Sequence, residues 1–459
     1  MSTLTKHARM TTLPVGRLVL GLAAPTIVAN LISSLYNMAD TYFVGGLGTS
    51  ATAGVGVVFA VMNIIQAIGF FFGQGSGNFI SRALGAQEQD SANVVASIGF
   101  FSSLLAGGLV MAGGLLFLEP LARLLGATET ILPHACDYMR YILIGAPFMA
   151  SSHVLSLMLR FQGNAVYSML GMVSGAVLNV GLDALFILVF HLGVAGAAIA
   201  TLISQIFSFL LLLYGCSRGD SIRISLRNFR PSVRHYLEIG KGGLPSLCSQ
   251  SLASVATISL NQAAKLHGDA VIAAISIVNR ILMLANGVVF GFTQGFQPFC
   301  GFNYGAKRYD RVRQGFWFCV RTLALLLVAL VILLALFAPQ LIRQFRDDPA
   351  VLEVGVRSLR LQCLAFPLTG WIVLTNMTLQ TLGRAFQASF TSLMRQGLFL
   401  LPLLAFLAPR FGVLGIQLSQ PLANLITFSI TLPLGLRLLR SLPETPPELL
   451  SGLAPPVLE

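Results

Sequence analysis

The chain has 459 residues, of which 55% are hydrophobic and only 10% charged, and its mean hydropathy is +0.79. A composition this apolar excludes an ordinary water-soluble domain and indicates a membrane protein. The net charge of +12 requires no nucleic acid partner, because basic loops in contact with anionic lipid explain such an excess. We therefore expect membrane lipids, and no nucleic acid, among its partners.

Apolar runs long enough to cross about 30 Å of hydrocarbon as a helix recur along the chain. The sequence lacks the short segments of alternating apolar and polar residues that a β-barrel requires. We predict an all-α integral membrane protein with twelve transmembrane helices, at 18–44, 53–80, 94–118, 134–158, 166–190, 194–216, 240–264, 271–299, 315–339, 354–381, 388–408 and 413–438.

The loops between these helices differ in charge. Most of the 29 Lys and Arg residues fall on the side of the N-terminus, in loops that include Arg82, Arg160, Arg227 and Arg311. Because cytoplasmic loops retain positive charge, we expect both termini to be cytoplasmic. The N-terminal stretch has no small-residue cleavage pattern, so we expect no removed signal peptide. The absence of an organellar targeting signal favours a bacterial inner membrane.

The first six helices are repeated in the second half of the chain. One constant shift along the sequence, without a gap, pairs Pro25 with Pro245, Gln74-Gly75 with Gln294-Gly295, and Pro147 with Pro367. Because six is even, the second copy enters the membrane in the same direction, which predicts parallel repeats around an axis along the membrane normal. The predicted parts are an N-terminal lobe (1–216), a cytoplasmic linker (217–239), a C-terminal lobe (240–442) and a disordered cytoplasmic tail (443–459).

Two carboxylates lie inside the apolar segments of the first half. Asp40 lies eight residues before Gly48 and Asp183 eight residues before His191, so each is about 12 Å from its helix end. Thr201 lies eight residues after Gly193 and therefore at the same level. Each acid also has a polar neighbour one turn earlier on its own helix: Tyr36 precedes Asp40, and Asn179 precedes Asp183.

Ionisable residues at this depth usually mark an ion, proton or substrate pathway. A pair of buried carboxylates can take up a proton, and with Asn and Thr oxygens it can also hold a hard monovalent cation. The sequence does not choose between these two. The alternative is that each Asp only bonds polar groups between helices. The six cysteines are scattered singly and indicate neither a disulfide framework nor a metal site.

Four stretches, LYNMADTYFVGGLG, GQGSGNFISRALGA, RFQGNAVYSM and LNVGLDALFILVFHLGVAGAAIATLISQ, resemble the prokaryotic multidrug and toxic compound extrusion (MATE) family. Within it, they resemble the DinF-like branch with its MepA-type drug exporters. The resemblance covers essentially the whole chain. It implies a V-shaped, two-lobe antiporter that exports cationic or amphipathic drugs in exchange for H⁺ or Na⁺. It also implies a cation site in the N-terminal lobe, made by Tyr36, Asp40, Asn179, Asp183 and Thr201, with Tyr138 or instead Tyr141.

The second half lacks the acids of the first. The NorM-like branch has a Glu in its seventh helix, and here that position falls near Ala253. The second half instead carries Arg280 and Arg395 inside predicted helices, and we expect Gln262, Asn376 and Gln380 to lie toward the cleft. These arginines are candidates for a substrate or coupling role, and equally for bonding carbonyls and fixing helix packing.

We predict a secondary active antiporter that acts as a monomer without a cofactor, its coupling ion being H⁺ or Na⁺. The alternative is a flippase for a lipid-linked saccharide from the same wider superfamily. A cationic cleft would favour the flippase, and Arg280 and Arg395 are the hint of one. An enzyme acting on prenyl diphosphates would need Asp-rich motifs for Mg²⁺, which the sequence lacks, so we expect no enzymatic activity.

Overall fold

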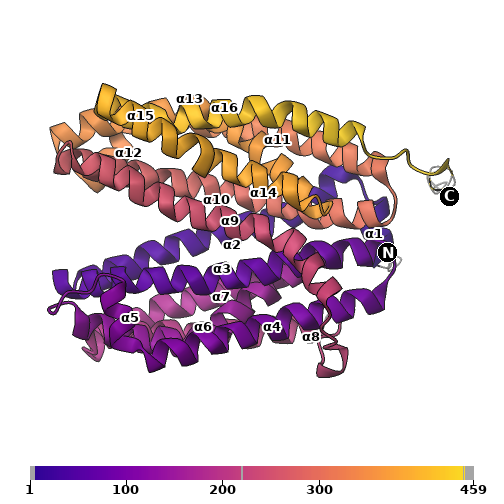
Figure 1. Cartoon of the computed structure of the whole chain (residues 1–459), viewed down its shortest axis with the longest axis horizontal. Helices are drawn as coiled ribbons and strands as arrows, with labels where there is room; N and C mark the ends of the chain where they lie inside the picture. The colour runs from indigo at the N-terminus through magenta and orange to yellow at the C-terminus, as the bar shows by residue number, and fades with distance from the viewer. Residues whose placement is uncertain (1–5, 219–220, 448, 450–459) are drawn as a thin grey trace. The chain divides into compact units, whose positions relative to one another are not determined.

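The computed structural model describes residues 6–218, 221–447 and 449, and within them every regular element is helical (Figure 1). The elements are α1 (Lys6–Thr12), α2 (Val15–Gly45), α3 (Thr49–Gly85), α4 (Gln89–Leu116), α5 (Leu118–Leu124), α6 (Leu132–Phe161), α7 (Ala165–Asp183), η1 (Ala184–Val189), α8 (Gly193–Ser217), η2 (Leu226–Asn228), α9 (Val233–Lys265), α10 (Asp269–Gly305), α11 (Tyr309–Leu336), α12 (Ala338–Phe345), α13 (Pro349–Thr381), α14 (Ala385–Leu393), η3 (Met394–Leu400), α15 (Leu401–Phe411) and α16 (Val413–Arg440).

The predicted all-helical membrane fold is confirmed. Among the described residues, 11 helices are long and apolar enough to cross a membrane. They correspond to eleven of the twelve predicted spans, with η1 continuing α7 and with η3 and α15 continuing α14. The remaining predicted span is α9, which is 33 residues long but richer in polar residues.

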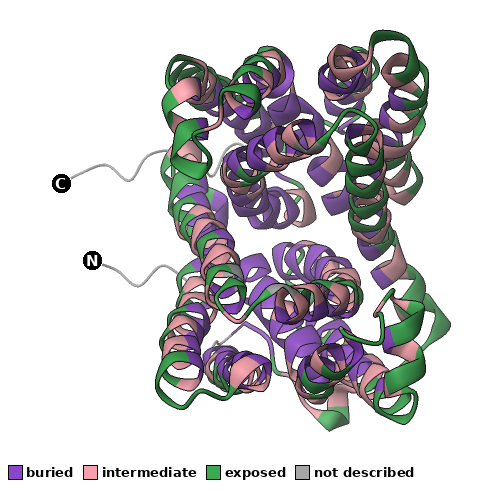
Figure 2. Cartoon of the chain, turned by 90° about the vertical axis from the view of Figure 1, so that its left-hand side faces the viewer, coloured by how far each residue is buried: buried purple, intermediate pink, exposed green. Residues whose placement is uncertain are grey.

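The chain forms two compact units. The N-unit comprises Ala24–Leu84 and Glu88–Leu247, and the C-unit comprises Met1–Ala23, Gly85–Gln87 and Cys248–Glu459. Two of their boundaries therefore fall inside α2 and α9, close to Pro25 and Pro245. In each unit buried residues face the interior of the helix bundle and exposed residues its outside (Figure 2).

The repeat is visible in one close contact within each unit. A Cβ added to Gly75 on α3 would lie 2.2 Å from the Ile239 carbonyl oxygen on α9. A Cβ added to Gly295 on α10 would lie 2.4 Å from Cα of Ala23 on α2. The two glycines occupy equivalent positions of the repeat, and each lets the backbone of a neighbouring helix approach too closely for any side chain.

The central helix of each unit is also repeat-related. In the most apolar 18-residue stretch of α6, 83% of the residues are buried, and in that of α13 67% are buried. These are the two highest shares among the membrane-spanning helices described. The α6 side chains Met139, Leu143 and Leu155 are fully buried. Lipid tails are as apolar as these side chains, so their burial stabilises the bundle through close van der Waals packing between helices and not through removal from water.

The linker between α8 and α9 is bound along α4, inside the N-unit. Four residues of α4, each one helical turn after the last, contact residues of the linker in the same order along the chain. Three of them form hydrogen bonds with backbone groups of the linker, which would otherwise lack partners. Gln89 Nε2 donates to Ser221 O, Asn93 Oδ1 accepts from Arg223 N (2.7 Å), Ser97 Oγ accepts from Ser225 N (3.2 Å), and the Phe101 ring meets Phe229 edge-on with centroids 5.5 Å apart.

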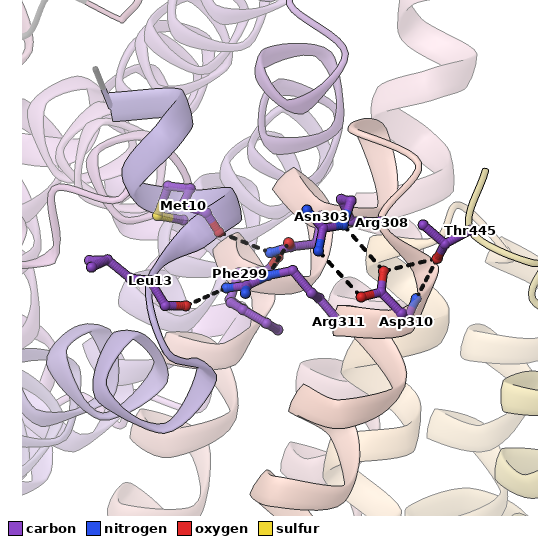
Figure 3. Close-up of polar contacts among 8 residues, drawn as sticks. All are labelled: Met10, Leu13, Phe299, Asn303, Arg308, Asp310, Arg311 and Thr445. Carbon is purple, nitrogen blue, oxygen red and sulfur yellow. Dashed lines mark hydrogen bonds and ion pairs between the residues drawn. The ribbon is translucent and has the colours of Figure 1, made fainter. Parts of the chain in front are cut away.

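The end of α10 and the start of α11 hold segments from both ends of the chain in the C-unit (Figure 3). Asn303 Nδ2 donates to Met10 O at 3.2 Å, and Arg311 Nη2 donates to Leu13 O at 2.6 Å. Thr445 Oγ1 donates to Asp310 Oδ1 at 2.9 Å. Thr445 belongs to the tail predicted to be disordered; residues 448 and 450–459 of that tail lie outside the described residues.

Candidate functional site

The N-unit brings three helices together around the two acids. Asp40 comes from α2, Asp183 is the last residue of α7, and Thr201 lies on α8. Their exposed fractions are 4%, 0% and 3%, and Asn179 is 2% exposed. The depth arithmetic placed these residues at one level, and the fold does bring them into one buried cluster.

Asn179 connects the acid on α7 to the hydroxyl on α8. With its amide oriented to satisfy both ends, Asn179 Nδ2 donates to Asp183 Oδ2 at 2.9 Å. Its Oδ1 then accepts from Thr201 Oγ1 at 3.3 Å and from the Thr201 backbone N–H at 3.2 Å. Asn179 lies one helical turn before Asp183, so its bond to that acid follows from the i, i+4 spacing, whereas its bonds to Thr201 depend on the packing of α8 against α7.

The carboxylates are only partly satisfied. Asp40 Oδ1 and Asp183 Oδ1 are buried without a hydrogen-bond partner among the described residues. No ion pair joins either acid to Lys, Arg or His in that part of the chain. A buried charge with neither partner is costly, so these oxygens form a place where a cation or a proton would be stabilised.

Two tyrosines complete the cluster. Tyr36 is on α2 and Tyr138 on α6, and both interact electrostatically with Asp40 and Asp183. Tyr138 is fully buried, and its hydroxyl lies next to Thr201 as well as to the acids. Tyr141 is only partly buried and packs against the surrounding apolar cluster. Of the two alternatives, Tyr138 is therefore the tyrosine that the fold places beside the acids.

The backbone next to Asp183 is irregular, which sequence reasoning did not foresee. The π-helical segment η1 begins at Ala184, directly after the acid. Such segments widen one turn, shift the hydrogen-bond ladder by a residue, and occur often at functional sites. No residue type in the stretch ALFILV signals this change, because its apolar pattern fits an α-helix equally well.

His153 is an ionisable residue that sequence reasoning missed. It lies in the second half of α6, with Nδ1 3.0 Å from Met149 O and Nε2 3.4 Å from Gln66 Nε2. Its position inside a predicted span was a signal of function by the same rule that singled out the acids.

Arg160 is buried, although the sequence predicts that it lies in a cytoplasmic loop. It lies in the last turn of α6 and is only 5% exposed. Its Nε donates to Ser168 Oγ at 2.9 Å, which links α6 to α7.

The candidate residues of the C-unit do not form a comparable cluster. Arg280 on α10 is exposed, and Arg395 in η3 is half-buried. Asn376 instead joins α13 to α14: its Nδ2 donates to Ala388 O at 2.7 Å and to Ser392 Oγ at 3.0 Å, and its Oδ1 accepts from Gln380 Nε2 at 2.6 Å. These amides therefore contribute to helix packing in the C-unit.

Comparison with known proteins gives a consistent result over nearly the whole chain. The MatE family model matches residues 25–185 and again residues 245–406, two segments that begin at the repeat-related Pro25 and Pro245. The chain is 28% identical over 406 residues to the multidrug export protein MepA of Staphylococcus saprophyticus, across 88% of this chain and 90% of that protein. It is 26% identical over 413 residues to the MepA of Staphylococcus aureus, across 90% and 91%.

Solved structures agree. An outward-facing conformation of a multidrug resistance MATE family transporter of the MOP superfamily has a TM-score of 0.91 at 27% identity, covering 96% of this chain and 99% of that chain. A MOP superfamily transporter from Pyrococcus furiosus, whose reverse polarity of binding pocket is said to suggest a different function, has a TM-score of 0.89 at 27% identity, covering 97% and 100%.

Proposed function

The chain belongs to the MatE family and is a multidrug efflux transporter, and on this premise we propose that it is an antiporter driven by inward H⁺ or Na⁺. Its proposed substrates are cationic or amphipathic drugs and toxic compounds. It is a multi-pass membrane protein and not an enzyme, and we place it in a bacterial inner membrane with both termini cytoplasmic.

The single observation that supports coupling is the buried pair of acids. Asp40 Oδ1 and Asp183 Oδ1 lack any partner among the described residues, in a cluster that is at most 4% exposed at either acid. A cation bound there would supply the missing charge and fill the missing hydrogen bonds. Loading and emptying this site is therefore linked to a large change in the electrostatic energy of the N-unit.

The neighbouring groups define what the site can hold. A proton needs only one carboxylate oxygen. Asn179 and the Tyr138 hydroxyl can then orient the protonated carboxyl group. A bare Na⁺ would take oxygens from the carboxylates and Thr201. Either ion and a cationic drug compete for one negative site, directly or through conformation. This competition is the proposed basis of exchange, because a ligand shifts a two-state equilibrium only by its differential affinity for the states.

The experiment is efflux of a fluorescent cationic dye from proteoliposomes that contain the wild type or Asp40→Asn. A pH gradient and a Na⁺ gradient are imposed separately. We expect efflux under one gradient, lost in the variant, which identifies the ion. Wild-type transport that continues unchanged in Asp40→Asn would refute the coupling role of Asp40. No dye movement under either gradient, with folded protein, would favour the flippase, and a lipid-linked saccharide would then be the substrate to test.

A further inference from the structure

An open pocket of about 600 Å³ lies in the C-unit between the short helix α12 and the first half of α13. Its walls include Pro339 and Arg343 from α12 and Glu353, Arg357, Arg360 and Leu364 from α13. The α13 residues are spaced by three or four positions, so they form one stripe along the helix. This volume is within the range of pockets that hold drug-sized ligands.

The pocket has a marked excess of positive charge. Three arginines face a single acid, Glu353. Arg343 forms an ion pair with Asp347 outside the pocket, Nε to Oδ1 3.4 Å, in an exposed setting. Arg357 and Arg360 form no ion pair among the described residues, and Arg360 uses only its Nε, which donates to Ala335 O at 3.3 Å. The remaining N–H groups suit the bidentate recognition of a phosphate.

The rest of the wall is apolar. Leu352, Val356, Leu361 and Leu364 line the pocket, and Leu364 is 78% exposed. A soluble anion would gain nothing from these side chains. An anionic amphiphile would cover them with its chains while its headgroup neutralised the arginines.

The position along α13 fits the same kind of ligand. The 33 residues of α13 span about 50 Å, so centring the helix on about 30 Å of hydrocarbon leaves about 10 Å at each end. Arg357 and Arg360 lie about 12 and 16 Å from the start at Pro349, just inside this boundary, so their long side chains can reach the headgroups. Leu364 lies about 22 Å from that start, among the acyl chains.

We propose that this pocket binds an anionic phospholipid of the surrounding bilayer, with the phosphate on Arg357 and Arg360 and the chains along Leu361 and Leu364. The site is separate from the acids of the N-unit. The proposal does not depend on the coupling mechanism.

The test measures the Tm of the purified, full-length protein in detergent. Phosphatidylglycerol is added in one arm, phosphatidylcholine with the same acyl chains in a second, and inorganic phosphate in a third. The variants are Arg357→Gln/Arg360→Gln, the charge-conserving Arg357→Lys/Arg360→Lys, and Arg346→Gln as control, since Arg346 is an exposed arginine at the end of α12 that does not line the pocket. Native mass spectrometry counts the bound lipid in each sample.

We expect phosphatidylglycerol to raise the wild-type Tm by several degrees more than phosphatidylcholine, because a ligand that binds only the folded state stabilises it. The control should keep the full shift, the lysine pair part of it, and the glutamine pair none. A full shift in the glutamine pair, or an equal shift with phosphatidylcholine, would overturn the proposal. An equal shift with inorganic phosphate would overturn it in favour of a free oxyanion. If the glutamine pair does not fold, each single Arg→Gln variant should show a smaller shift than the control.

Discussion

In both the N-unit and the C-unit, a π-helical segment interrupts the same helix of the repeat. The segment begins at a different position in each unit, and it lies beside an acidic residue in the N-unit and a basic residue in the C-unit. The helix begins at Ala165 in the N-unit and at Ala385, the equivalent position of the repeat, in the C-unit. It runs 19 residues before η1 in the first case and 9 residues before η3 in the second. Asp183 directly precedes η1, and Arg395 is the second residue of η3.

The position of the π-helical segment therefore follows the charged residue in each unit, and it is not the same position of the repeat. A scaffold contact such as that of Gly75 and Gly295 has the same position in both units, whereas the charged positions have diverged. From this contrast we expect scaffold substitutions to act alike in the two units and polar substitutions to act differently.

The largest difference should appear between Asp183→Asn and Arg395→Gln. We expect Asp183→Asn to reduce gradient-driven dye efflux to the level of protein-free vesicles, because Asn keeps the bond to Asn179 but cannot supply the charge. Arg395→Gln should retain efflux with the same ion dependence, since the proposed coupling site lies within the N-unit. An equal loss of dye efflux in the two variants, measured in vesicles of the same composition, would contradict the proposed functional difference between the N-unit and the C-unit.

The scaffold is tested by Gly75→Ala and Gly295→Ala. In each, the new Cβ meets backbone atoms at 2.2 or 2.4 Å, so we expect each to destabilise by about 1–3 kcal/mol. Thermal unfolding in detergent measures both. Gly108→Ala is the matched control, because a Cβ there meets nothing within 4 Å and Ala favours a helix. A loss confined to one unit would contradict the symmetry of the scaffold.

Asn179→Ala and Asn376→Ala separate packing from coupling. Each leaves polar groups without their amide partner, and we expect each to cost about 1–3 kcal/mol. Only Asn179→Ala should also change the cation concentration that gives half-maximal efflux, since Asn376 bonds α14 and not an acid. If Asn376→Ala shifted that concentration as well, the amides of the C-unit would have a role beyond packing.

The smallest effect is expected outside the spans. Glu129 accepts a hydrogen bond from Arg123, and this exposed pair lowers the pKa of the Glu129 carboxyl. A lowered pKa means that the stabilisation is present above the ordinary pKa and is lost as the pH falls through the folded value. Glu129→Gln should therefore lower the Tm marginally at pH 7 and not at all in strong acid. A larger deficit at low pH than at pH 7 would contradict this sign.

The sequence predicted the fold well because helices in lipid must satisfy their own backbone and so appear as long apolar runs. The level shared by Asp40, Asp183 and Thr201 was predictable from a fixed rise per residue. The bridge through Asn179 was not, because it depends on how α7 and α8 rotate against each other. The π segments and the burial of Arg160 were also missed, since hydrogen-bond register and side-chain environment leave no mark in an apolar pattern.

The binding of the linker along α4 has a consequence for biosynthesis. Ser221, Arg223, Ser225 and Phe229 all find partners on a helix that is made long before them. The N-unit ends at Leu247 and α10 begins at Asp269, so the linker and its partners on α4 are all synthesised before α10. The linker can therefore bind α4 and complete the N-unit while most of the C-unit is still being synthesised.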